Sequence, residues 1–174
     1  MADISKSIAI TIDLAHEGGY QDNPKDRANW TGGQVSVGVL VGTKYGITTL
    51  DMPGVVIKDL TPEQATCWYL TTHTPQRFNN PLYAQIVSQT ICDKLFDMGV
   101  LFGVGTAVKN LQAALDLNMD GIFGPITLAR LNAANEVLVL STFEYELILH
   151  ARAIAASNPN DAPDLDDWIR RIKS

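Results

Sequence analysis

The chain has 174 residues, with 13 basic and 19 acidic side chains and a formal net charge of −6. Hydrophobic residues make up 46% of it, enough to offset the ordering entropy of a compact fold, so general disorder is excluded. The negative charge, without a Lys/Arg run, argues against a nucleic-acid partner. Two cysteines, Cys67 and Cys92, exclude a disulfide scaffold or a thiolate zinc site; a single bridge stays open, but we expect two reduced thiols.

Residues 4–13 are too polar for a signal-peptide core, and no stretch approaches the ~20 apolar residues that span a bilayer. We therefore expect synthesis in the cytoplasm without stable membrane insertion. The three histidines (His16, His73 and His150) show no metal-ligand spacing, so we expect no metal and no cofactor.

The first half combines a helix with a β-like segment. Ile4, Ile8 and Ile12 recur at helical spacing and predict a helix over residues 4–17, which Gly18-Gly19 ends. Alternating valines (Val35, Val37, Val39 and Val41) between glycines predict a short β-hairpin or flap near residues 31–42.

The rest of the chain predicts further helices. Thr61-Pro62-Glu63-Gln64 is a capping-box start for a helix to about His73. Apolar spacing, turns and caps predict others over 81–98, up to about 117, from Pro125, from Asn135 and over 164–172. The mixed charges of the last segment, Arg170, Arg171 and Lys173 among them, predict a solvated face. The fold class is mainly α.

Glu17 stands out chemically. A carboxylate at a helix C-terminus faces the negative end of the macrodipole, which disfavours its charged form. That environment suits a general acid with a raised pKa, although an ordinary solvated glutamate fits the position equally well. Asp26, nine residues later, could position water or stabilise a developing cation, with Asp22 as the alternative. Both aspartates also suit a turn.

These residues belong to a longer pattern. His16-Glu17-Gly18-Gly19-Tyr20, then Asn23-Pro24 and Asp26, then Gly42-Thr43-Lys44-Tyr45-Gly46-Ile47-Thr48, resemble glycoside hydrolase family 108. Its members are N-acetylmuramidases, typically phage endolysins and prophage proteins once labelled secretion activators. The resemblance implies a lysozyme-like helical fold. It also implies cleavage of the β-1,4 bond between N-acetylmuramic acid and N-acetylglucosamine in peptidoglycan.

Carried over by motif, Glu17 matches the catalytic acid, and Asp26 and Thr43 match the residues that would hold the attacking water. The substrate-binding side chains implied are Tyr20, Trp30, Tyr45 and Thr48. Core packing is the alternative for the two tyrosines. Two departures stand out: an insert near residues 27–41 resembles a flap of many phage members, and Leu101 stands where members often carry Asn.

The second half resembles the peptidoglycan-binding module found in the same family. The residues that carry this resemblance are Asp120, Gly121, Gly124, Pro125 and Thr127. A helix–loop–helix connector is the alternative. We therefore expect a lysozyme-like catalytic region over 1–98 and a peptidoglycan-binding-like region over 99–174, packed as one body.

The resemblance implies an endolysin with bacterial peptidoglycan as its partner, and we expect the protein to be a monomer. Such a protein would be stored in the host cytoplasm and would reach the cell wall in the periplasm after holin-type release. A lytic transglycosylase and a non-catalytic wall-binding or secretion-promoting protein are the alternatives.

Overall fold

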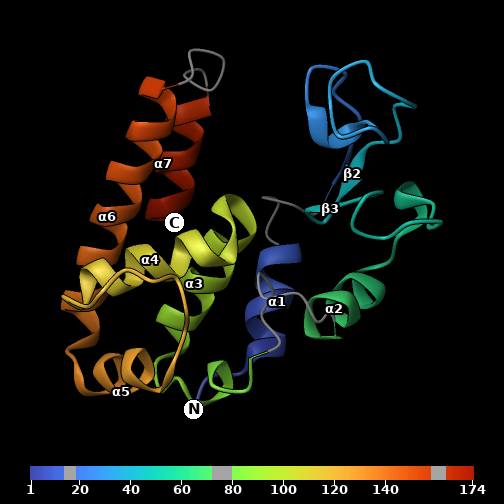
Figure 1. The fold of residues 1–174 in the computed structure, drawn as a ribbon. Helices are drawn as coiled ribbons and strands as arrows, with labels where there is room; N and C mark the ends of the chain where they lie inside the picture. The colour runs from blue at the N-terminus through green and yellow to red at the C-terminus, as the bar shows by residue number, and fades with distance from the viewer. Residues whose placement is uncertain (14–18, 72–79, 158–163) are drawn as a thin grey trace. The chain divides into compact units, whose positions relative to one another are not determined.

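A computed structural model describes residues 1–13, 19–71, 80–157 and 164–174 (Figure 1). The described residues form two compact units: unit 1 comprises Met1–Ser7 and Thr74–Ser174, and unit 2 comprises Ile8–His73. The predicted mainly helical fold class is confirmed. In the described ranges, no helix combines the length and apolarity that a membrane crossing needs. The α-helices are α1 (Ile4–Asp13), α2 (Pro62–Thr71), α3 (Gln89–Phe102), α4 (Val104–Ala114), α5 (Pro125–Ala133), α6 (Glu136–Ser157) and α7 (Leu165–Lys173).

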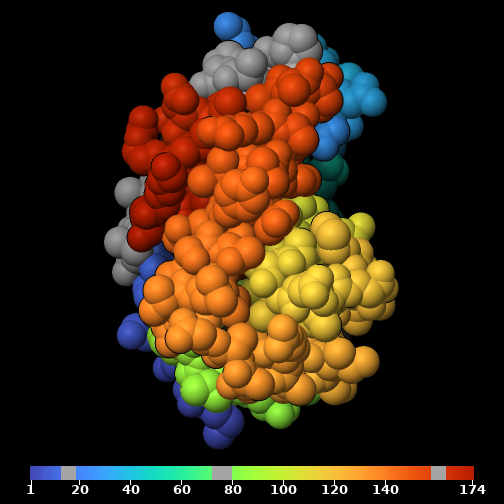
Figure 2. Space-filling view, turned by 90° about the vertical axis from the view of Figure 1, so that its left-hand side faces the viewer, coloured from blue at the N-terminus to red at the C-terminus, as the bar shows by residue number. Residues whose placement is uncertain are grey.

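Unit 1 is built from packed helices. α3 packs on α4, α4 on α6 and α6 on α7 (Figure 1). The α6 residues that enter the core recur at helical spacing, as an amphipathic helix requires: they are Val139, Phe143, Leu147 and Ala151. Figure 2 shows the opposite side of α6 at the surface, drawn in orange. This outer side carries exposed Leu138 and Tyr145.

Hydrogen bonds join the first residues of the chain to α3 and to the segment just before it. Ala2 N–H donates to the carbonyl of Ile86 at 2.6 Å. Ser7 Oγ donates to Asp93 Oδ1 at 2.6 Å, and Gln89 Nε2 donates to the same carboxylate oxygen at 2.6 Å. Residues 1–7 therefore belong to the same unit as helices that follow more than eighty residues later.

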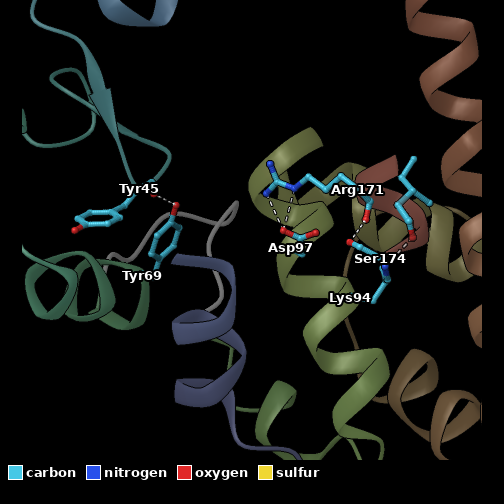
Figure 3. Close-up of polar contacts among 7 residues, drawn as sticks. Tyr45, Tyr69, Lys94, Asp97, Arg171 and Ser174 are labelled. Carbon is cyan, nitrogen blue, oxygen red and sulfur yellow. Dashed lines mark hydrogen bonds and ion pairs between the residues drawn. The ribbon is translucent and has the colours of Figure 1, made fainter. Parts of the chain in front are cut away.

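The α7 helix is held by buried charges. The predicted solvated face is confirmed for Asp167 and Arg170, which are exposed, and is wrong for Arg171. Arg171 is buried and its Nη2 donates to Asp97 Oδ1 at 2.7 Å (Figure 3). Lys94 Nζ donates to the carbonyl of Ile172 at 2.7 Å and lies 4.0 Å from Glu144 Oε1. The sequence pattern failed here because α7 also carries exposed charges, and alternating signs do not reveal which arginine has an acidic partner in the core.

Unit 2 contains a three-stranded antiparallel sheet in the order β1 (Tyr20–Gln21), β2 (Thr43–Lys44) and β3 (Ile47–Thr48). The β2–β3 turn is Tyr45-Gly46, and both residues have positive φ, +56° and +70°, as a type I′ hairpin turn requires. Tyr69 on α2 donates its hydroxyl to the Tyr45 carbonyl at 2.8 Å (Figure 3), which ties this turn to the helix.

The segment over residues 31–42 is a flap, and its alternating valines do not form a strand. Positive φ at Gly33, Ser36 and Gly38 interrupts the extended backbone that a strand needs. One antiparallel bridge, Trp30 to Leu40, closes the segment. Val35, Val37 and Val39 are 48%, 47% and 63% exposed, so their alternation does not mark a buried face.

Most predicted helix starts are confirmed. Thr61 and Gln64 form the reciprocal capping box, with Thr61 N–H to Gln64 Oε1 at 2.9 Å and Gln64 N–H to Thr61 Oγ1 at 3.2 Å. Asn135 Oδ1 accepts from the Leu138 N–H at 3.1 Å, and Pro125 opens α5.

The helix predicted over 81–98 is wrong at both ends. Residues 83–85 form a 3-10 turn, η3 (Tyr83–Gln85). α3 begins after Ser88, whose hydroxyl caps the Ile91 N–H at 3.1 Å, and it continues through buried Gly99 to Phe102. The division into functional regions at 98 therefore falls inside a helix, and it stays a prediction.

Candidate active site

The expected acid, Glu17, lies outside the described residues, as does its neighbour His16. The predicted partners Asp26 and Thr43 are both described, and both lie in unit 2. The described part of the candidate site is therefore the side that would hold water.

Asp26 is a partly buried carboxylate held from two sides. It caps the 3-10 turn η1 (Arg27–Asn29), with Oδ1 accepting from the Ala28 N–H at 2.9 Å. Its other oxygen, Oδ2, accepts from Gln21 Nε2 at 2.9 Å. Asp26 thus has both a turn-forming role and a fixed orientation, whereas the alternative carboxylate, Asp22, is exposed.

Thr43 is buried on β2 and is linked to Asp26 through two amides. Its hydroxyl donates to Asn29 Oδ1 at 2.7 Å. Asn29 Nδ2 donates to Gln21 Oε1 at 2.7 Å, and Gln21 in turn donates to Asp26. The β1–β2 register supports this arrangement, because Gln21 and Thr43 are directly opposite each other. We refer to Gln21, Asp26, Asn29 and Thr43 as the polar network.

Two of the aromatic residues predicted to bind sugar lie close to the polar network. Tyr20 is half-buried on β1 and donates its hydroxyl to the Val41 carbonyl at 3.2 Å. Trp30 is half-buried and donates Nε1–H to the Pro24 carbonyl at 2.9 Å. Both polar tips are therefore engaged with backbone, and sugar binding by either ring stays a prediction.

The other two predicted substrate residues serve turns. Tyr45 is 8% exposed and occupies the β2–β3 turn, so the structure favours packing for its ring. Thr48 N–H and Oγ1–H both donate to Asp51 Oδ2 at 2.9 Å, which stabilises the turn that follows β3. A role in substrate binding for either residue stays a prediction.

Sequence reasoning missed Gln21 and Asn29. Asn29 is fully buried, and its amide is the centre of the polar network. No motif marks either residue, because Gln21 follows the Tyr20 pattern and Asn29 sits in the insert. Gln21 lies on β1 and Asn29 on η1, and only the tertiary fold brings both amides beside Thr43 of β2, so spacing along the chain carries no signal for them.

The peptidoglycan-binding-like motif is organised around buried Gln112 of α4. Gln112 Nε2 donates to Asp120 Oδ1 at 2.7 Å, and Gln112 Oε1 accepts from the Gly121 N–H at 2.9 Å. Thr127 is 3% exposed, with Oγ1 3.2 Å from Gln112 Nε2. Gly124 and Pro125 start α5. The polar groups of the motif thus stabilise the loop from within, and glycan contact by this segment stays a prediction.

Burial or hydrogen bonds shift the pKa values of several side chains outside the polar network. Hydrogen bonds from the Ile122 N–H and from Gln112 lower the pKa of Asp120. Burial lowers the pKa of His150 and raises that of the Cys92 thiol. Both cysteines are free. Within the described ranges, no three His, Cys, Asp or Glu side chains gather into a possible metal site.

Comparison with known proteins agrees with the fold and the motifs. A structure described as "Structure of Brucella abortus SagA" superposes with a TM-score of 0.72 at 21% identity, covering 98% of this chain and 89% of that one. The similarity to SagA shows the fold. The comparison with curated proteins found no match. The family model described as Glycosyl hydrolase 108 matches residues 10–103, more than half of the chain. The chain therefore belongs to glycosyl hydrolase family 108: it is a glycoside hydrolase, and the family supports peptidoglycan as its substrate.

Proposed function

We propose that this protein is an N-acetylmuramidase that hydrolyses the β-1,4 bond between N-acetylmuramic acid and N-acetylglucosamine, with Glu17 as the general acid. Family membership supports the reaction class. The observation that carries the proposal is the polar network, because it links the carboxylate of Asp26 to the hydroxyl of Thr43 although 16 residues separate them in the sequence.

The proposed chemistry divides between an acid and a water site. Glu17 gives its proton to the glycosidic oxygen as the bond to the anomeric carbon breaks. Asp26 and Thr43 hold a water that attacks that carbon from the other side, and Asp26 takes the proton that the water loses. Each carboxylate oxygen of Asp26 accepts one hydrogen bond, from Ala28 and from Gln21, so each keeps a lone pair for water.

Half-buried Tyr20 and Trp30 provide ring faces near this water site, which supports a role in sugar stacking. A tyrosine hydroxyl or indole N–H already bonded to backbone holds its ring in one orientation. Preorganised rings of this kind bind a ligand with less loss of side-chain entropy.

The test is wall hydrolysis by the wild type, Glu17→Gln, Asp26→Asn and Thr43→Val. We expect wild type to clear purified cell walls and release new reducing ends, and Glu17→Gln to lose at least about a hundredfold, the typical contribution of a general acid. Equal activity of wild type and Glu17→Gln removes Glu17 from the mechanism. No activity in wild type favours the wall-binding alternative.

Product analysis separates the hydrolase from the lytic transglycosylase. Hydrolysis leaves reducing muramic acid ends, whereas an anhydro-muramic end excludes water as the nucleophile. The anomer formed first, followed by proton NMR, distinguishes inversion from retention. A role as an endolysin released through a holin is part of the proposal; lysis only when a holin is co-expressed supports it.

A further inference from the structure

The amides of Gln21 and Asn29 are both oriented by the backbone of one residue, Asn23. The Asn23 N–H, which can only donate, faces Gln21 Oε1 at 3.1 Å. The Asn23 carbonyl, which can only accept, faces Asn29 Nδ2 at 3.0 Å. Neither side-chain amide can be turned over without placing like groups opposite each other. The direction of every hydrogen bond in the polar network therefore follows from the backbone of this single residue.

One consequence concerns the hydroxyl hydrogen of Thr43. Asn29 Oδ1 can only accept, so the hydrogen bond of 2.7 Å between them takes the Thr43 hydrogen. A hydroxyl has one hydrogen and two lone pairs, which leaves Thr43 able only to accept from a further partner. Asn29 is 0% exposed, so solvent does not compete for its oxygen.

A second consequence concerns Asp26. Because Gln21 Oε1 is committed to the Asn23 N–H and to Asn29, its Nε2 has to face Asp26 Oδ2, where it donates at 2.9 Å. The carboxylate is therefore held by donors on both oxygens and presents lone pairs to its surroundings.

We propose that Asn29 is a positioning residue that orders the protons of the water site. With the Thr43 hydrogen committed to Asn29, a water between Thr43 and Asp26 donates one hydrogen to each. That water keeps both of its lone pairs, and one of them attacks the anomeric carbon. When the bond to carbon forms, the hydrogen that faces Asp26 passes to the carboxylate, and the leaving oxygen takes the proton of Glu17. This inference rests on the proposed function.

The first test is Asn29→Asp, which keeps the size and the oxygen that faces Thr43. The second oxygen replaces Nδ2 and faces two acceptors, Gln21 Oε1 and the Asn23 carbonyl. We expect kcat at neutral pH to fall about 10- to 100-fold with little change in KM, as for one mispaired buried group. The introduced carboxyl is buried, which favours its neutral form. When protonated it can donate again, so activity relative to wild type should recover as the pH falls.

The second test is a double-mutant cycle with Thr43→Val. Valine has no hydroxyl to orient, so adding Asn29→Asp should cost much less than it does in wild type. Asn110→Asp is the matched control: Asn110 is a buried asparagine of unit 1 whose Nδ2 donates to the Thr106 carbonyl at 2.9 Å. Losing this hydrogen bond in Asn110→Asp should lower thermal stability, while kcat and the pH profile of the folded protein stay at wild-type values.

Gln21→Glu keeps the test decisive if Asn29→Asp does not fold, because Gln21 is exposed on β1. It removes the donor to Asp26 and should show the same loss at neutral pH and recovery in acid, as two facing carboxyls share a proton. Rates are measured as the formation of new reducing ends on soluble glycan strands, and circular dichroism checks that each variant is folded. The inference is overturned, and the proposed function is not, if the activity of the variants relative to wild type does not change with pH or if the two losses in the double-mutant cycle are additive. An inactive wild type overturns the proposed function instead, and the inference with it.

Discussion

The buried pair between Asp97 and Arg171 predicts a large and specific loss of stability. The side chains are 15% and 8% exposed, and Arg171 reaches Asp97 Oδ1 through Nη2 at 2.7 Å and Nε at 3.1 Å. Asp97→Asn removes the negative charge and leaves Arg171 buried beside Lys94. Breaking a fully buried pair costs about 3–5 kcal/mol, so with the residual exposure of Asp97 we expect about 3 kcal/mol.

The chain offers a close control on the same helix. Arg170 Nη1 lies 2.8 Å from Asp167 Oδ1, but these side chains are 78% and 71% exposed. Asp167→Asn should cost well under about 1 kcal/mol, as exposed pairs do.

Thermal unfolding followed by circular dichroism measures both variants. For a chain of this size about 3 kcal/mol corresponds to a fall in Tm of roughly 6–12 °C. Replacing both partners, Asp97→Leu with Arg171→Met, should recover most of the loss, since no charge is then left unpaired. Equal Tm values for Asp97→Asn and Asp167→Asn would refute the reasoning that burial, and not distance, sets the worth of the pair.

Three further predictions concern single residues. Gln112→Leu leaves the Gly121 N–H without its acceptor and should lower the unfolding free energy by about 1–3 kcal/mol in urea titrations, with wall binding unchanged in the folded protein; lost binding at full stability would contradict this. Burial holds the pKa of His150 below its ordinary value of 6.5. The contribution of neutral His150 to stability is therefore complete above pH 6.5 and is lost as the pH falls towards the lowered pKa. The Tm of His150→Phe should fall less steeply than that of wild type over this pH range, and equal slopes for the two proteins would argue against the prediction. Gly42→Ala places a methyl group 2.4 Å from the Tyr20 ring at a φ of +76°, so it should lower the free energy of unfolding by about 1–3 kcal/mol, measured as a lower Tm. Gly54 has a φ of +84° but lies in open space, so Gly54→Ala should lose only the free energy needed to strain the backbone.

The sequence predicted the helices where caps and apolar spacing agree. Thr61 with Gln64, and Asn135 at the start of α6, carry both signals, and both helices begin where expected. The valines of residues 35–41 carry spacing alone. Because a strand also needs a partner and an uninterrupted extended backbone, positive φ at Ser36 and its neighbouring glycines overrides that pattern.

The candidate site was predictable only where a motif marks it. Asp26 and Thr43 were found through family resemblance, and the structure links them through Gln21 and Asn29. Those two amides were missed because the tertiary fold, not chain spacing, brings them beside Thr43. Arg171 was missed for a related reason: its neighbour Arg170 has the same chemistry, and only the tertiary fold decides which of the two is buried.

Unit 1 is built from two separate segments of the chain, and this affects the order of folding during synthesis. Residues 1–7 leave the ribosome well before their partners Gln89 and Asp93, which follow more than eighty residues later, and α7 is needed to place the Ile172 carbonyl beside Lys94. Unit 2 is continuous in sequence, so none of its internal contacts depends on residues that follow His73. Unit 1 has to wait until α7 emerges, so its contacts close late and over long loops, which slows folding and leaves its helices open to misassembly in the meantime.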